Sequence, residues 1–323
     1  MSTIPGQIFS HPGLLGCYGV PFQPFEFTGT AGRIFWVGNR SGLPAGNGSN
    51  PAYPFSTVNA ALAACEAGRN DVVYILPGHA ESISAADAWS NLVAGTKVIG
   101  LGTGNDRPTF TWTAQAGTIL ANVANVRIQN CRFLMAGALG STTALTVDVG
   151  IPITAAGFEF IGNYVNTGVD ADQLTTDAFT LSAAADQCTF YGNWMEAYAA
   201  AVTTSFITAS AAGANDLRII GNYMSAEIST AATGVLLDLD AGALLRTQII
   251  GNDLHNQTAS SKYVMDLHAD STGVIRGNYF YVGDGATGPA SLGSPVWGLH
   301  KIAENYCVTA VDKSAILCPA ADA

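Results

Sequence analysis

"LRIIGNYMSAE", residues 217–227, recurs along the chain in closely similar forms, most of which contain a Gly-Asn pair. The Asn residues that mark these repeats are Asn163, Asn193, Asn222, Asn252, Asn278 and, without a preceding Gly, Asn305. They are 30, 29, 30, 26 and 27 positions apart. A period in this range is typical of repeat architectures, in which each unit packs only against its neighbours.

The residues around each of these Asn residues alternate between apolar and polar. Three positions before the Asn stand Phe160, Phe190, Ile219, Ile249, Ile275 and Ile302, and two positions after it stand Val165, Met195, Met224, Leu254, Phe280 and Cys307. Alternation on both sides of a glycine predicts two short strands that meet at a corner. We expect the Asn side chains to hydrogen-bond from coil to coil as a structural ladder.

A further strand is predicted about a dozen residues before each corner, for example in "DAFTLSA" and "GVLLDLD". Helical periodicity is absent from this region, so the period cannot build strand–helix–strand units. Coils stacked about 4.8 Å apart fit it instead. The sequence therefore predicts an all-β fold, a single-stranded right-handed parallel β-helix. Its handedness follows from the general chirality of β crossovers.

The chain is expected to divide into three parts. Residues 1–50 are rich in Gly, Pro and aromatic residues and predict an extended N-terminal arm that needs a surface to lie on. Residues 51–310 predict the β-helix, and residues 311–323 a C-terminal tail. Three aromatic residues of the arm are candidates for an interface: Phe22, Phe25 and Phe27.

A short helix is predicted near residues 56–67, at the start of the β-helix. Ser56 is expected to cap it, and its apolar face contains Val58, Ala61, Leu62 and Cys65. "DVVYILPG" at 71–78 is predicted to be the first buried strand. An open strand edge recruits other chains, so we expect this helix to cap the first coil.

Composition restricts the classes of partner. The 323 residues include 13 Lys and Arg against 24 Asp and Glu, a net charge of −11. A surface with so few basic residues argues against nucleic acid and against anionic membranes. No apolar run reaches membrane-spanning length, and "MSTIPGQIFSHPG" lacks the features of a signal peptide. The six cysteines are scattered, so we expect reduced thiols, no metal site and no cofactor.

Two stretches carry a resemblance to known proteins. "NGSNPAYPFSTVNAALAAC" with "DVVYILPGHAESI" resembles the first part of pectate-lyase-like β-helix proteins. "VIGLGTGNDRPTFTW" followed by "NVRIQNCRF" resembles a group of bacteriophage β-helix proteins, often encoded beside head genes. The resemblance spans roughly residues 34–310 and implies the fold and a place in a virion. The calcium-binding acidic cluster and the basic residue of the lyases have no matching motif here, so no catalytic residue is carried over.

Outward-facing acidic residues are the candidates for catalysis. They are Asp238 and Asp240 in "LLDLD", and Asp266 with His268 in "MDLHAD". Asp240 and Asp266 both lie twelve residues before a corner Asn, so we expect them to be neighbours on one face. A separation of about 5 Å is that of a retaining glycosidase. Solubility of an acidic solenoid is the simpler explanation, and we favour it.

Aromatic residues recur directly after the corner Asn residues: Tyr164, Trp194, Tyr223, Tyr279 and Tyr306. Asp253 interrupts the series. By parity these side chains point outward and are candidates for an interface. Rows of exposed rings bind proteins, and stacking among themselves or cover by a loop explains them equally well; sugar binding is the weaker alternative.

Three functions remain open at this stage. The leading one is a non-enzymatic bacteriophage virion protein, made in the host cytoplasm, that decorates or cements the capsid surface. Its partner would be the major capsid protein or another virion protein, and the resemblance implies a homo-oligomer, for example a trimer. The second is a tailspike or fibre that binds host polysaccharide and hydrolyses it through Asp240 and Asp266. The third is a secreted polysaccharide lyase.

Overall fold

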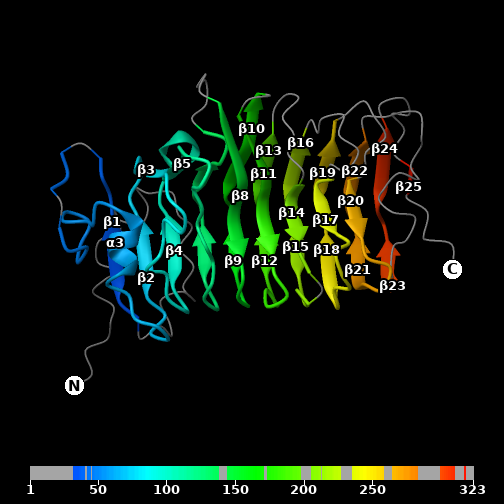
Figure 1. The fold of residues 1–323 in the computed structure, drawn as a ribbon, viewed down its shortest axis with the longest axis horizontal. Helices are drawn as coiled ribbons and strands as arrows, with labels where there is room; N and C mark the ends of the chain where they lie inside the picture. The colour runs from blue at the N-terminus through cyan, green and yellow to red at the C-terminus, as the bar shows by residue number, and fades with distance from the viewer. Residues whose placement is uncertain are drawn as a thin grey trace.

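The computed structural model describes residues 32–40, 42–44, 46–137, 144–170, 173–197, 205–211, 213–226, 235–257, 264–282, 299–309 and 316–317. Phe22, Phe25 and Phe27 lie outside these residues, as does most of the predicted tail. The described chain is nearly all strand. It forms a parallel β-solenoid whose coils are stacked along the long axis of the molecule (Figure 1).

One wall of the solenoid is a ten-stranded sheet in which strands from successive coils pair in parallel. In spatial order its strands are β1 (Ile34–Val37), β2 (Val72–Ile75), β4 (Lys97–Gly100), β6 (Arg127–Gln129), β9 (Glu159–Ile161), β12 (Thr189–Tyr191), β15 (Arg218–Ile220), β18 (Thr247–Ile250), β21 (Thr272–Arg276) and β23 (Leu299–Ala303). We call this the first wall.

Apart from β25 (Ile316–Leu317), which pairs antiparallel with the strand before it, the other strands form two further walls with parallel neighbours. The second wall contains β3 (Ala80–Ile83), β5 (Thr109–Trp112), β7 (Arg132–Leu134), β10 (Tyr164–Asp170), β13 (Trp194–Ala197), β16 (Tyr223–Ala226), β19 (Asp253–Asn256), β22 (Tyr279–Val282) and β24 (Tyr306–Thr309). The third contains β8 (Leu145–Ile153), β11 (Gln173–Leu181), β14 (Ser205–Ala209), β17 (Leu237–Leu239) and β20 (Met265–Leu267). An antiparallel contact between β10 and β11 joins these two walls.

Aromatic rings from successive coils stack inside the solenoid. The ring centroids of Phe110 and Phe133 are 5.4 Å apart, as are those of Phe133 and Phe160. Phe179 from the third wall lies 4.7 Å from Phe160 and 5.0 Å from Phe190. All five side chains are fully buried. Residues at equivalent positions therefore pack on one another along the axis, as the alternation in the sequence predicted.

From the coil of β9 onward, the chain turns from the first wall to the second at a corner where a buried Asn side chain links two coils. The backbone N of Asn222 donates to Oδ1 of Asn252 at 2.9 Å. The Nδ2 of Asn222 donates to the same oxygen at 3.0 Å and to the carbonyl of Phe190 at 2.9 Å. The same bonds repeat from Asn163 to Asn305. This ladder satisfies backbone groups that the corner takes out of the sheets.

The solenoid begins earlier than expected. β1 pairs with β2 in parallel from Ile34 to Val37, inside the segment predicted to be the arm, so the strand at 71–78 is the second of its wall. Trp36 stacks on Tyr74 with ring centroids 5.3 Å apart. The paired backbone and this ring contact explain why residues that lack a full repeat still join the sheet.

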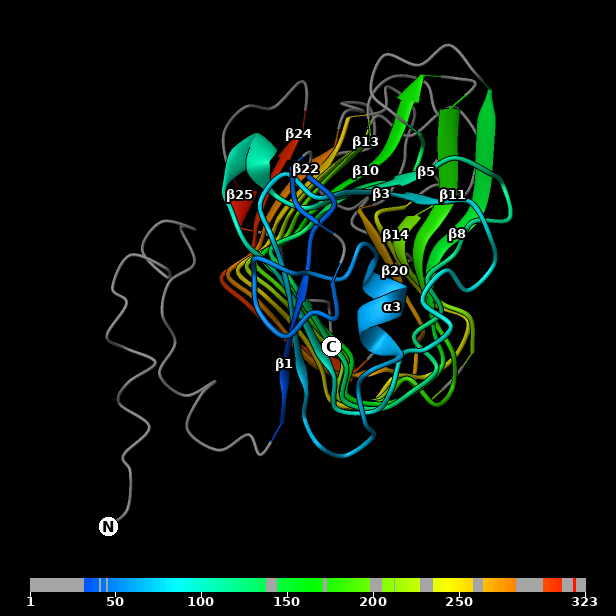
Figure 2. The ribbon, with the colours of Figure 1, turned by 90° about the vertical axis from the view of Figure 1, so that its left-hand side faces the viewer.

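The predicted helix is present but shorter than residues 56–67. It is α3 (Val58–Leu62), and its N-cap is Thr57 rather than Ser56. The Thr57 side chain accepts a hydrogen bond from the backbone N of Ala60 at 3.2 Å, which satisfies a free donor of the first turn. Figure 2 shows α3 at the end of the solenoid where the chain begins. Its role as a cap of the first coil stays a prediction.

The cysteines differ in state. Cys65, Cys131 and Cys188 are free thiols, and the last two are buried. Burial raises the pKa of Cys131 and of Cys188 to about 12, so both are inert at neutral pH. Cys307 in β24 is disulfide-bonded, and the expectation of reduced thiols is wrong for this residue. Spacing in the sequence does not reveal which cysteines meet in space, which is why the bond was missed.

Candidate functional site

The outer face of the second wall carries a row of aromatic side chains in register. Tyr164 pairs with Trp194, which pairs with Tyr223, and Tyr279 pairs with Tyr306. Trp194 is 51% exposed and Tyr306 45%, whereas Tyr164 and Tyr223 are half-buried. The rings of Trp194 and Tyr223 are 4.4 Å apart. Rings therefore recur on the outer face of this wall at the spacing of the coils.

His255 continues the row at the coil where Asp253 was expected to interrupt it. Asp253 occupies the position between Tyr223 and Tyr279, and its carboxylate lies 2.6 Å from Nε2 of His255, two residues further on. The imidazole ring lies 5.4 Å from Tyr223 and 5.8 Å from Tyr279. It also stacks on Tyr281 at 5.5 Å. Asp253 therefore positions a ring instead of breaking the series.

Glu196 positions the side chains of Tyr164 and Trp194 through hydrogen bonds. Its side chain is buried on the same face, two residues after Trp194. The indole Nε1 of Trp194 donates to Glu196 Oε2 at 2.8 Å, and the hydroxyl of Tyr164 donates to Glu196 Oε1. Both polar edges are thereby satisfied within the protein. We call Tyr164, Trp194, Tyr223, His255, Tyr279, Tyr281 and Tyr306 the ring row.

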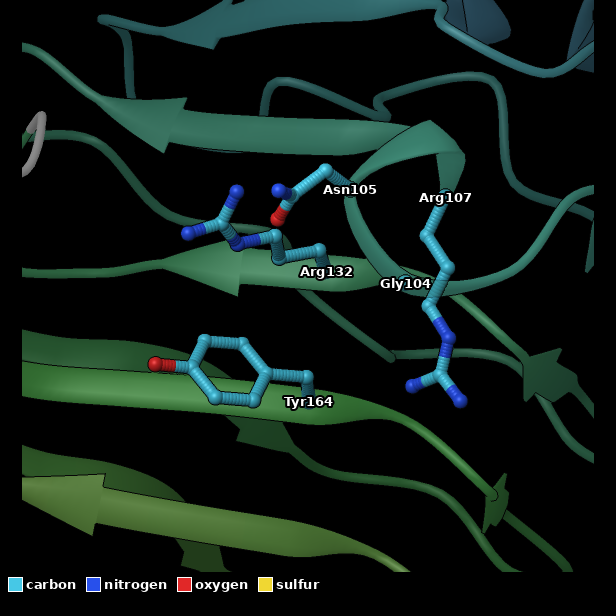
Figure 3. A pocket seen from close by; sticks show the side chains of 5 residues that line it. All are labelled: Gly104, Asn105, Arg107, Arg132 and Tyr164. Atoms are coloured by element: carbon cyan, nitrogen blue, oxygen red, sulfur yellow. The ribbon is translucent and has the colours of Figure 1, made fainter.

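A basic pocket lies at the N-terminal end of the ring row. It has a volume of about 280 Å³ and is lined by Gly104, Asn105, Arg107, Arg132 and Tyr164 (Figure 3). The guanidinium carbon of Arg132 lies 5.4 Å from the ring centroid of Tyr164, a cation–π contact. The sequence reasoning missed both arginines. Arg132 could have been found, because it occupies the position after the corner one coil before Tyr164.

The acidic candidates lie on the outer face of the third wall, and their register differs from the prediction. Asp238 pairs with Asp266, not Asp240 with Asp266. The error arose from counting back from the corner Asn, because the turn between β17 and β18 is longer than that between β20 and β21. Backbone pairing is decided by the strands, and turns of unequal length shift the count.

Burial and neighbouring carboxylates change the protonation of this face. Burial, a hydrogen bond to Asp240 and repulsion from Asp240 and Asp266 raise the pKa of Asp238 to about 6. Burial also raises the pKa of Asp177, although the hydroxyls of Ser205 and Thr208 donate to its Oδ1 at 2.8 Å. Asp238 is therefore partly protonated near pH 6.

His268 does not join the acidic residues in a catalytic arrangement. Its Nδ1 accepts from the backbone N of Asp270 at 3.2 Å and lies 3.9 Å from the carboxylate of Asp270, within the same turn. In the described ranges, no three His, Cys, Asp or Glu side chains group as a metal ion would require. None of the helices in the described part of the chain has the length and hydrophobicity needed to cross a bilayer.

Comparison of the chain with protein-family models, with curated proteins and with solved structures gave no match. The class of protein is therefore defined here by its fold and by the features of its surface. It is a parallel β-solenoid that presents a row of positioned rings on one outer wall, with a basic pocket at the end of that row.

Proposed function

We propose that the protein is a non-enzymatic structural protein of a bacteriophage virion, bound to the capsid surface as a decoration or cement protein. The ring row is the single observation that supports binding to a protein partner. Tyr and Trp are enriched in such interfaces, and exposed apolar patches of this extent mark sites of interaction. The resemblance of the sequence to bacteriophage β-helix proteins supports the virion as the setting. We include three further features in this proposal: the solenoid winds right-handed, α3 caps its first coil, and the N-terminal residues form an extended arm.

The arrangement of the rings supports binding rather than catalysis. Glu196 and Asp253, the acidic residues closest to the rings, are both engaged in positioning them. Rings whose orientation is already determined lose little conformational entropy when a partner covers them. Trp and Tyr at the centre of an interface typically contribute about 2 kcal/mol or more each when truncated to Ala.

The first test is the location and copy number of the protein. Quantitative mass spectrometry of purified particles should find it in a simple ratio to the major capsid protein, as expected of a component that follows the capsid lattice or its symmetry. Absence from purified particles would contradict the proposal.

The second test uses two rings of equal exposure on different walls. Tyr191 in β12 and Trp194 in β13 are each 51% exposed. Trp194→Ala should weaken binding to particles at least tenfold, whereas Tyr191→Ala should leave it unchanged, because only Trp194 belongs to the ring row. Sedimentation of particles with labelled protein measures both. Equal occupancy of the two variants would place the contact elsewhere.

A deletion tests the arm, and the structure decides where it should end. Residues 1–31 can be removed without shortening β1, which begins at Ile34. If the arm attaches the protein, this deletion should release it from particles while its thermal unfolding midpoint stays unchanged. Full occupancy by the truncated protein would assign attachment to the solenoid alone.

Binding of host polysaccharide is the second candidate function, and the exposure of Trp194, Tyr279 and Tyr306 favours it. Sugar rings stack on exposed aromatic rings through their apolar sides. A tailspike of this kind should retain host surface polysaccharide on an affinity matrix, and Trp194→Ala should abolish retention. If it also cleaves the chain, reducing ends should appear, and Asp238→Asn or Asp266→Asn should stop their release, since these two residues are the paired carboxylates.

A further inference from the structure

The pocket beside Tyr164 concentrates positive charge in an acidic molecule. Asn105 belongs to the turn η2 (Gly104–Asp106), Arg107 directly follows it, and Arg132 begins β7. Figure 3 shows Arg107 on one side of the pocket, Arg132 with Asn105 on the other, and Tyr164 on the neighbouring strand. The chain has a net charge of −11 and only 13 basic residues, so two arginines in one pocket are a distinct local feature.

These two arginines lack the carboxylate partner that some other arginines of the solenoid have. Arg69, Arg127 and Arg246 each form an ion pair with a carboxylate, at 2.5–2.6 Å. Within the described residues, Arg107 and Arg132 form none. The Nε of Arg107 is buried without a hydrogen-bond partner there, and Arg132 contacts the ring of Tyr164. A guanidinium without a carboxylate partner can take an anionic ligand, and both arginine side chains line the pocket.

We propose that this pocket binds a carboxylate group of an organic ligand. A carboxylate has the planar geometry that matches the guanidinium fork, and its single charge suits a site on an acidic protein. A bare inorganic oxyanion fills only about the volume of two or three water molecules, each roughly 30 Å³ in the liquid. The pocket holds about 280 Å³, which leaves room for a carbon skeleton against Tyr164.

The carboxylate can belong to a free organic acid or to an acidic side chain of a partner protein, and the chemistry at the two guanidinium groups is the same. The inference goes beyond the proposed function, because a free acid needs no virion partner. Arg107 lies outside the ring row, so its replacement tests the pocket without changing the rings.

The experiment measures binding of succinate to the full-length protein by ligand-observed NMR at low ionic strength. Its neutral analogue succinamide and inorganic sulfate serve as comparison probes. A blocked glutamyl peptide, acetyl-Ala-Glu-Ala-amide, and its Gln counterpart represent the protein source. Succinate should bind, succinamide should not, and sulfate should bind at least threefold more weakly than succinate.

The variants separate the pocket from general charge. Arg107→Gln and Arg132→Gln should each weaken succinate binding about tenfold, while Arg218→Gln, on the exposed face of β15, should have no effect. Arg107→Lys should retain part of the affinity, because the charge stays and the fork is lost. Thermal unfolding of each variant verifies that it is folded.

Tighter binding of the glutamyl peptide than of succinate would assign the carboxylate to a protein, and the reverse to a free acid. Absence of succinate binding at 10 mM (roughly the weakest affinity of interest), equal binding by Arg107→Gln, or equal binding of sulfate would each overturn the proposal. Loss of succinate binding in Arg107→Gln with unchanged binding to particles would separate this site from the ring row.

Discussion

Single residues at the corners of the solenoid adopt a backbone conformation that few residue types accept. Gly221 has a φ of +62°, and a Cβ atom there would meet nothing within 4 Å. Two corners have other residues in the equivalent position, Asn130 at +55° and Glu304 at +56°. The corner therefore depends on the left-handed conformation itself and not on the lack of a side chain.

The backbone conformation predicts a graded series of variants at this corner. Gly221→Ala should lower the free energy of unfolding by about 1–2 kcal/mol, because an L-residue with a Cβ is strained in this region. Gly221→Asn should cost less, since Asn accepts the conformation more readily. Glu304→Gly should stabilise the protein. Denaturation in urea measures the free energy of unfolding of all three variants. An equal loss of stability in Gly221→Ala and Gly221→Asn would show that the backbone angle φ does not determine the cost.

At the level of the strand, the third wall brings carboxylates together that are far apart in the chain. Asp238 on β17 pairs with Asp266 on β20. Thr208 on β14 pairs with Asp238 and also donates to Asp177. Each strand has few outward positions, so acidic residues that recur there must face one another across about 4.8 Å. Burial, and then repulsion from the neighbouring carboxylates, raises the pKa of Asp238.

Stability should depend on pH through Asp238. Its pKa of about 6 in the folded protein lies above the ordinary value of 3.8, so folding strengthens proton binding. The resulting stabilisation is complete below pH 4 and is lost as the pH rises through 6. Because the side chain is partly exposed, screening reduces the loss to about 1–2 kcal/mol.

The variant Asp238→Asn isolates this effect. It should remove most of the loss of stability between pH 4 and pH 7, so that the variant is the more stable protein at neutral pH. Asp270→Asn, in an exposed turn, is the matched control and should follow the wild type. Parallel pH profiles for wild type and Asp238→Asn would refute the assignment.

At the scale of the whole molecule, the described strands of the first wall each pair with the strands of the coils on either side. The Asn ladder runs through the stack from Asn163 to Asn305. An interior Asn such as Asn222 bonds to the coils on both sides, whereas Asn305 lies at the end of the ladder and accepts from Asn278. Nearest-neighbour packing means that an interior defect disturbs two interfaces and a terminal one disturbs a single interface.

This difference predicts unequal costs along the ladder. Asn222→Ala should lower the free energy of unfolding by about 3 kcal/mol, because it leaves buried backbone and side-chain donors of Asn193 without their acceptor. Asn305→Ala removes the same acceptor from Asn278, but Asn305 has no bond to a following coil like that of Asn222 to Asn252, so it should cost less, about 2 kcal/mol. Urea denaturation measures the change in the free energy of unfolding of each variant. Hydrogen exchange should show that the loss of protection is confined to the adjacent coils. Equal costs, or loss of protection throughout, would contradict nearest-neighbour stacking.

The repeat was sufficient to predict the coil, its corners and which side chains point inward. Those features depend on alternation and on glycine, which act over a few residues and are visible in a single sequence. The pairing of Asp238 with Asp266 was not predictable in this way, because the lengths of turns shift the count. His255 was missed for a related reason: it reaches the ring row from two residues beyond the expected position.

By itself, the sequence of this protein determined a stack of parallel coils with a polar ladder inside and rings outside, since each of these follows from local periodicity. Only the tertiary structure decided which outward residues meet. Arg107 and Arg132 lie on different coils, and Glu196 is placed beneath rings from two strands. Such contacts depend on the register between coils. That register is established only when the whole chain packs, so no single segment of the sequence determines it.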